Sequence, residues 1–166
     1  MNVKEPVLSQ YLAALEMLKL AVSNCPASLW NDPKDKNQFW HIAYHALFYT
    51  HLYVQVSREK FKAWTQHRPH YEQLGPYPKS SEGKPQIKEP YTKEEILSYL
   101  DFCAKDVQDK MTLLDLEADT SGFSWLPFGK LELQIYNIRH LQHHTAELME
   151  RLGERENIEI DWVGKK

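Results

Sequence analysis

The feature that most constrains the fold is residues 37–57, which contain no Asp, Glu, Lys or Arg. An uncharged run of this length is long enough to span a bilayer. This one also carries His41, His45, His51 and two glutamines, which are costly in hydrocarbon. The mean hydropathy of the chain is −0.60. A helix that is apolar on nearly every face is instead typical of the centre of a helical bundle, so we predict a soluble protein without a membrane partner.

Apolar residues recur at helical spacing in four stretches. We predict four helices, over residues 7–22, 36–60, 92–116 and 130–152. Residues 61–90 separate the second and third helices and are rich in proline and glycine. A connection this long allows a crossover between parallel helices. The sequence therefore predicts an all-α fold, a four-helix bundle with a long crossover loop, in a single domain over residues 1–166.

Particular residues mark the ends of these helices. Asp32 or Asp35 can cap the second helix, because a carboxylate accepts hydrogen bonds from free backbone N–H groups. Thr92 and Glu95 have the spacing of a capping box at the start of the third helix. Gly153 is placed as the C-terminal cap of the fourth helix.

Composition excludes several classes of function. The chain has 20 Lys and Arg against 23 Asp and Glu, a net charge of −3, which disfavours a nucleic-acid partner. It lacks the glycine-rich phosphate loops, the GxSxG elbow of serine hydrolases and the HExxH helix of zinc proteases. Residues 1–6 contain no apolar leader, and two cysteines, Cys25 and Cys103, form no disulfide framework. We therefore expect a cytoplasmic protein.

The eight histidines suggest a metal site, because six of them lie on the second and fourth predicted helices. His41 and His45 are four residues apart on one helix, and His140 and His144 are four apart on the other. Residues at this spacing share a helix face, and two imidazoles one turn apart can bind one transition-metal ion. A third imidazole from a facing helix would leave open positions for water or substrate.

Other polar residues on the fourth helix allow two interpretations each. His143 cannot share the inward face with His144, because neighbouring residues diverge by ~100° around a helix. Glu147 can orient a ligand imidazole or form a surface pair with Arg151, and we favour the surface pair. Asn137 can contact a substrate or bond to a loop carbonyl. The histidines themselves can be hydrogen-bonded core residues without a metal.

Two segments resemble the DinB/YfiT-like superfamily of metal-binding four-helix bundles. They are residues 40–53, WHIAYHALFYTHLY, and residues 138–148, IRHLQHHTAEL, which looks like the family pattern H-x-x-H-H-x-x-x-L. The resemblance follows the helix order over nearly the whole chain. It implies a homodimer that holds one divalent transition-metal ion per chain, nickel or zinc.

The resemblance implies that His45, His140 and His144 are the metal ligands, with His41 in reserve for His45. His45 is preferred because an apolar run, residues 46–48, follows it as in the family. Family members with assigned activities are largely thiol-dependent transferases or isomerases. The expected function is therefore metal-dependent activation of a low-molecular-weight thiol, or of water, for transfer to or hydrolysis of a small-molecule substrate. The alternative is a non-catalytic helical stress-response or interaction module with structural histidines.

Residues 145–147, Thr-Ala-Glu, depart from the family, in which small residues are common at this point. The departure concerns the surroundings of the ion and leaves the three ligand positions unchanged. A role in DNA binding, which the family name suggests, is opposed by the net charge of −3 and by the lack of a basic stripe.

Overall fold

A computed structural model describes residues 2–75 and 87–166. Its α-helices are α1 (Lys4–Asn24), α2 (Ala27–Trp30), α3 (Phe39–Tyr53), α4 (Lys93–Leu113) and α5 (Lys130–Glu156). A short 3-10 helix, η1 (Arg58–Lys60), follows α3. No strand occurs in these described ranges. The predicted all-α class is confirmed, although the four-residue α2 was not predicted.

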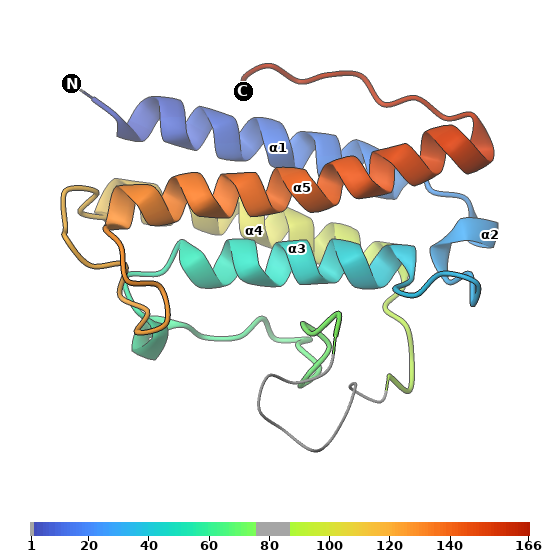
Figure 1. Cartoon of the computed structure of the whole chain (residues 1–166), viewed down its shortest axis with the longest axis horizontal. Coiled ribbons are helices and arrows are strands. Elements are labelled where there is room, and N and C mark those ends of the chain that lie inside the picture. The colour runs from blue at the N-terminus through green and yellow to red at the C-terminus, as the bar shows by residue number, and fades with distance from the viewer. Residues whose placement is uncertain (1, 76–86) are drawn as a thin grey trace.

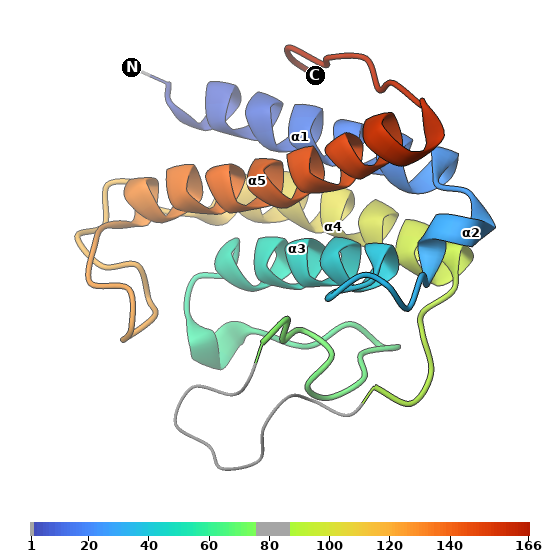
Figure 2. The ribbon, with the colours of Figure 1, turned by 45° about the vertical axis from the view of Figure 1, so that its right-hand side comes forward.

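The four long helices lie side by side (Figures 1 and 2). α3 packs against α5 and α4, and α1 packs against the same two helices. The described part of the connection from α3 to α4 lies along the outside of α3, and these two helices run in the same direction (Figure 1). This is the crossover that the long connection allowed. Part of the predicted loop, residues 76–86, lies outside the described residues.

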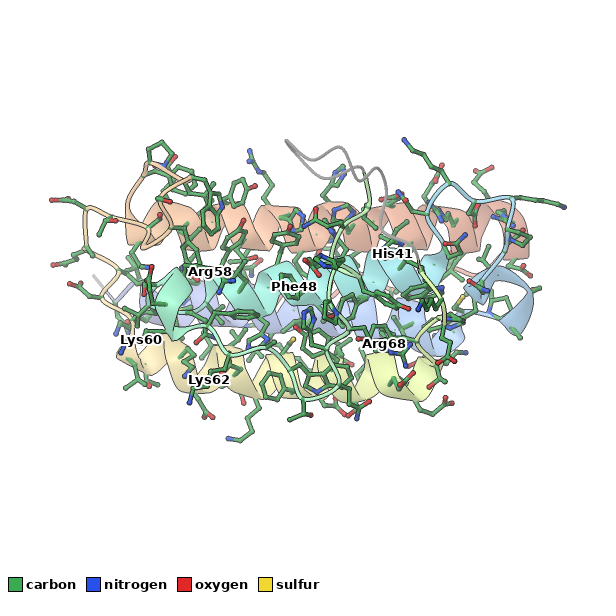
Figure 3. The ribbon with its side chains drawn as sticks, turned by 90° about the horizontal axis from the view of Figure 1, so that it is seen from below. His41, Phe48, Arg58, Lys60, Lys62 and Arg68 are labelled. Carbon is green, nitrogen blue, oxygen red and sulfur yellow. The ribbon has the colours of Figure 1, made fainter. Side chains whose placement is uncertain are left out.

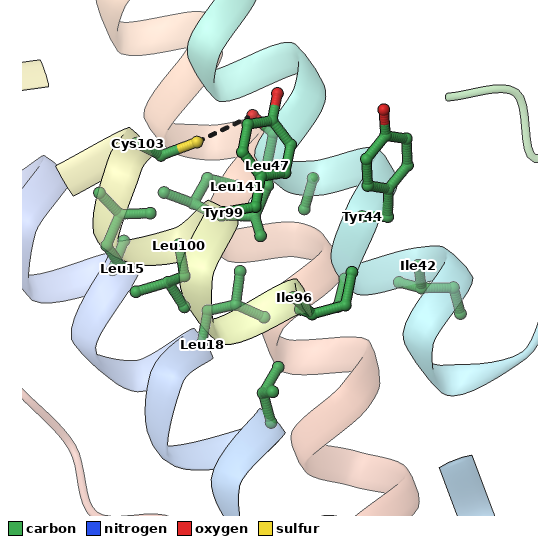
Figure 4. Packing of buried hydrophobic residues seen from close by; sticks show 14 of the residues in the cluster. Leu15, Leu18, Ile42, Tyr44, Leu47, Ile96, Tyr99, Leu100, Cys103 and Leu141 are labelled. Carbon is green, nitrogen blue, oxygen red and sulfur yellow. Dashed lines mark hydrogen bonds between the residues drawn. The ribbon is translucent and has the colours of Figure 1, made fainter. Parts of the chain in front are cut away.

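The core explains why α3 carries no charge. Because α3 packs against both α4 and α5, most of its faces are buried, with Trp40, Tyr44 and Leu47 almost fully enclosed. Figure 4 shows this packing, in which the thiol of Cys103 on α4 points at the backbone carbonyl of Leu47, 3.6 Å away. No helix in the described part of the chain is long and apolar enough to cross a membrane.

The helix ends follow the predictions only in part. Thr92 and Glu95 form the predicted capping box of α4, with both reciprocal hydrogen bonds present. The prediction for Gly153 is wrong. α5 continues to Glu156, and Asn157 adopts the left-handed conformation (φ 54°) that ends the helix. Asparagine tolerates this conformation better than most residues.

The predicted cap of α3 is also wrong, and the helix is shorter than residues 36–60. Gln38 occupies the N-cap position without a side-chain cap. Asp32 and Asp35 instead form ion pairs with arginines of α5. At the other end α3 stops at Tyr53.

Side chains of α5 satisfy the backbone carbonyls at this C-terminal end of α3. The amide of Gln134 donates to the carbonyl of Tyr53 at 3.2 Å, and that of Asn137 donates to the carbonyl of Thr50 at 3.1 Å. The ammonium of buried Lys130 donates to the carbonyls that follow the helix and to a loop carbonyl, those of Gln55, Val56 and Ser121. The last carbonyls of a helix lack partners within it, so these donors fix where α3 ends against α5.

Candidate metal centre

The candidate site lies where the middle of α3 faces the middle of α5. His45 comes from α3, and His140 and His144 come from consecutive turns of α5. Nε2 of His45 lies 3.1 Å from Nε2 of His140. One ring nitrogen from each of the three histidines lies within 4.8 Å of the other two. The structure thus brings together the three residues that were predicted as ligands.

The spacing of these nitrogens fits a tetrahedral ion. Ligand nitrogens at ~2.0–2.1 Å from zinc lie about 3.4 Å apart in that geometry. The 3.1 Å between His45 and His140 is close to this separation. An N–H···N hydrogen bond between two neutral imidazoles has the same length, so the distance by itself also fits a metal-free pair.

A loop carbonyl orients the ring of His45. Nδ1 of His45 lies 2.6 Å from the backbone oxygen of Glu72. Since a carbonyl oxygen only accepts hydrogen bonds, Nδ1 carries the proton and Nε2 presents its lone pair to His140 and His144. This is the usual way in which a neighbouring group fixes the tautomer of a metal-binding imidazole. Glu72 was not predicted, because only the path of the loop along α3 brings residue 72 to residue 45.

A carboxylate orients the ring of His144. Nδ1 of His144 lies 3.2 Å from Oε2 of Glu147, and Oε1 of Glu147 accepts a hydrogen bond from Arg151 at 3.0 Å. Glu147 therefore contacts the ring of His144 and also pairs with Arg151, so the two interactions considered for it from the sequence occur side by side. Arg151 is itself anchored by the backbone oxygen of Asn37 at 2.8 Å.

His140 has a different environment. Its Nδ1 is buried and has no hydrogen-bond partner among the described residues. The ring is held by packing against its neighbours, with its centroid 4.7 Å from that of His144 and 5.5 Å from that of Tyr49. A buried polar atom without a partner is unfavourable, which sets His140 apart from a satisfied core histidine.

Burial keeps all three imidazoles neutral at neutral pH. It lowers the pKa of His45 to about 3, an effect that the neighbouring imidazoles strengthen. Burial and the adjacent His144 lower the pKa of His140 to about 4. Burial also lowers the pKa of His144, and Glu147 partly opposes that effect. Neutral imidazole is the form that binds metals, so protons compete little for these three nitrogens.

A cavity of about 500 Å³ opens beside the histidines and is lined in part by His45 and His140. This volume is in the range of small-molecule sites. Most of its other lining residues are aromatic, namely Phe48, Tyr49, Tyr53, Phe61, Trp125 and Tyr136. Glu72 and Arg58 also line it. The three-histidine cluster is therefore open to a molecule of substrate size.

The remaining predicted residues lie elsewhere. His41 stacks on Trp40 and bonds to the backbone oxygen of Tyr71 at 2.9 Å, away from the other imidazoles. His143 is exposed, and its ring meets that of His144 edge to face. It could form a second group of potential ligands with His144 and Glu147. Asn137 is fully buried and does not line the cavity, so it is a packing residue that bonds to α3.

Compared with models of protein families, with curated proteins and with solved structures, the chain matches none. The likeness to DinB/YfiT-like bundles therefore rests on the two quoted segments and their histidines.

Proposed function

We propose that this chain is a divalent-metal-dependent enzyme of the DinB/YfiT-like type that acts on a small molecule. One observation carries the proposal: imidazole nitrogens of His45, His140 and His144 lie within 4.8 Å of one another, and the first two residues line a cavity of about 500 Å³. Three histidines with an open side are the ligand set of catalytic rather than structural transition-metal sites. Zinc or nickel suits such ligands.

The same proposal assigns the four long helices to a DinB-type four-helix bundle and the chain to a homodimer. The bundle assignment is supported by the order of the helices, by the crossover between α3 and α4 and by the position of the histidines on α3 and α5. The homodimer is proposed from the resemblance alone. The family assignment is an inference from these features and from the quoted motifs.

Five residues build the proposed site, three as ligands and two that orient the ligand rings. His45, His140 and His144 hold the ion, while the carbonyl of Glu72 and the carboxylate of Glu147 fix two of the rings. A divalent ion held by these residues would lower the pKa of a thiol or a water molecule and so supply a nucleophile at neutral pH. The aromatic walls of the cavity exclude bulk water from the reacting end and bind the apolar part of the substrate.

Turnover by loaded protein tests the proposal. Zinc- and nickel-loaded samples are incubated with a low-molecular-weight thiol and an electrophile, and separately with activated esters. We expect metal-dependent consumption of thiol or ester that His140→Ala abolishes and that Glu150→Ala, which removes an exposed side chain of the same helix, preserves. Equal rates with and without metal would contradict the proposal. They would favour a non-catalytic module in which the contact between His45 and His140 is an N–H···N hydrogen bond.

A further inference from the structure

The cavity beside the histidines is elongated along α3. Its lining residues on α3 run from His45 to Tyr53. Eight residues of helix span about 12 Å. Figure 3 shows the corresponding order along this side of the molecule, with His41 toward one end of α3, Phe48 near the middle and Arg58 toward the other end. We call this cavity the α3 groove.

Rings from three separate segments form the walls of the α3 groove. Phe48 and Tyr49 project from α3, Tyr136 projects from α5, and Trp125 belongs to the loop before α5. The indole N–H of Trp125 lies 3.4 Å from the hydroxyl of Tyr53, which ties the loop to α3. Trp125 keeps 52% of its surface exposed. Aromatic walls of this kind favour a flat, apolar ligand body.

The two charged side chains of the groove differ in sign and in place. Glu72 lies at the histidine end, where its backbone oxygen contacts His45. Its Oε2 is buried and accepts no hydrogen bond from the described residues. Arg58 lies beyond the far end of α3, with its guanidinium 5.6 Å from the ring centre of Phe61. Among the described residues no carboxylate lies within ion-pair distance of Arg58.

This charge arrangement determines the orientation of a ligand. A carboxylate at the histidine end would meet the carboxylate of Glu72. At the other end it would meet the guanidinium of Arg58, which forms no ion pair within the described residues, the carboxylate of the adjacent Glu59 being hydrogen-bonded to Ser57. A guanidinium binds a carboxylate through two parallel hydrogen bonds. The buried Oε2 of Glu72 instead favours a group that donates a hydrogen bond, such as a hydroxyl, an amine or a thiol.

We propose that the α3 groove binds a flat, apolar organic carboxylate, with its carboxylate at Arg58 and its reacting end at the three histidines. The position of the reacting end rests on the proposed function. The recognition of the aromatic body and the carboxylate depends only on groove residues and holds with or without a metal ion.

Calorimetry with two matched probes tests the ligand class. A biphenyl carboxylate and the corresponding neutral carboxamide are titrated into chelator-treated and zinc-loaded protein. We expect the carboxylate to bind about fivefold more tightly than the carboxamide, as an exposed ion pair allows. Arg58→Gln should remove this preference. Lys60→Gln, which removes a charge from the same exposed turn outside the groove lining, should retain it. Binding should also change the fluorescence of Trp125, and Trp125→Phe should abolish that change.

Absence of binding by both probes, equal affinity for the two, or a preference that survives Arg58→Gln would each overturn the inference. In cobalt-loaded protein, the ring distant from the carboxylate should show the stronger paramagnetic relaxation, and the opposite order would overturn the orientation. The two proposals fail separately. If the protein binds no cobalt but keeps the Arg58-dependent preference, the metalloenzyme proposal is contradicted and the ligand class is supported. If it binds cobalt but neither probe, the ligand class is contradicted and the metal site is supported.

Discussion

The carboxylate of Glu147 lies 3.2 Å from Nδ1 of His144, so Nδ1 carries the proton and the lone pair of that imidazole is left on Nε2. The same carboxylate is held by Arg151 at 3.0 Å. Two fixed bonds on one carboxylate leave the ring of His144 little freedom to rotate. The geometry of the cluster therefore depends on residues that do not belong to the ligand set.

We predict that Glu147→Gln weakens zinc binding by about 10–100-fold, because such orienting groups commonly have effects of that size. Competition with a chromophoric chelator measures the affinity. Glu150→Gln is the matched control, since Glu150 lies exposed on the same helix. An unchanged affinity in the Glu147 variant would show that this carboxylate does not position His144.

Lys130 is predicted to stabilise the end of α3. Its buried ammonium serves three backbone carbonyls, although burial lowers its pKa to about 8. Replacement in Lys130→Met leaves these acceptors without a donor and should lower the free energy of unfolding by about 2–4 kcal/mol. Lys4→Met removes one exposed hydrogen bond to the carbonyl of Thr112 and should lower the free energy of unfolding by less than about 1 kcal/mol. Urea unfolding compares the two, and equal losses would contradict the assignment.

Gly122 is predicted to be required where the loop before α5 meets α3. It adopts φ 83°, and a Cβ there would collide with the backbone oxygen of Val56. Gly122→Ala should therefore destabilise the protein by about 1–3 kcal/mol. Gly153→Ala provides the opposite case, because nothing lies within 4 Å of the added carbon inside α5. It should stabilise the protein by about 0.5–1 kcal/mol. Thermal unfolding of the two variants should shift in opposite directions, and a shared direction would refute this prediction.

Metal-free protein should lose stability as the pH falls from about 6.5 toward 4. Burial lowers the pKa of His51 to about 4, and burial acts in the same direction on His45 and His140. The unfolded chain takes up these protons near pH 6.5 while the folded chain does not, so the stabilisation is complete above that pH and is lost below it. Each such histidine lowers the free energy of unfolding by up to about 1.4 kcal/mol for each pH unit of acidification in this range.

Denaturant unfolding across this pH range, with and without His51→Gln, measures the effect. The variant should lessen the slope by the equivalent of about one proton. A pH-independent free energy of unfolding in the native sequence would contradict the buried, neutral state of these rings.

The sequence predicted features that depend on local spacing. Periodicity located the four long helices, and the spacing of Thr92 and Glu95 located a cap that the structure contains. The pairs at four-residue spacing included the three histidines that the structure brings together, and the resemblance favoured His45 over His41. Each of these features is determined by residues within a few turns of one another.

The features that were missed depend on contacts between distant segments. α3 ends early because Gln134 and Asn137, on another helix, donate hydrogen bonds to its last carbonyls. Glu72 reaches His45 because a loop returns along α3. Asp35 pairs with an arginine of α5 instead of capping the nearer helix. No spacing rule along the chain predicts such contacts, since they arise only once the helices have packed.

Metal content per chain tests the central claim most directly. Untagged protein is incubated with excess zinc or nickel, dialysed and analysed for bound ion, alongside His45→Ala, His140→Ala, His144→Ala and the control His41→Ala. We predict about one ion per chain in the native protein and in the His41 variant, and none in the other three. Absence of a bound ion in the native protein, or its retention in all three cluster variants, would contradict a metal site at these histidines.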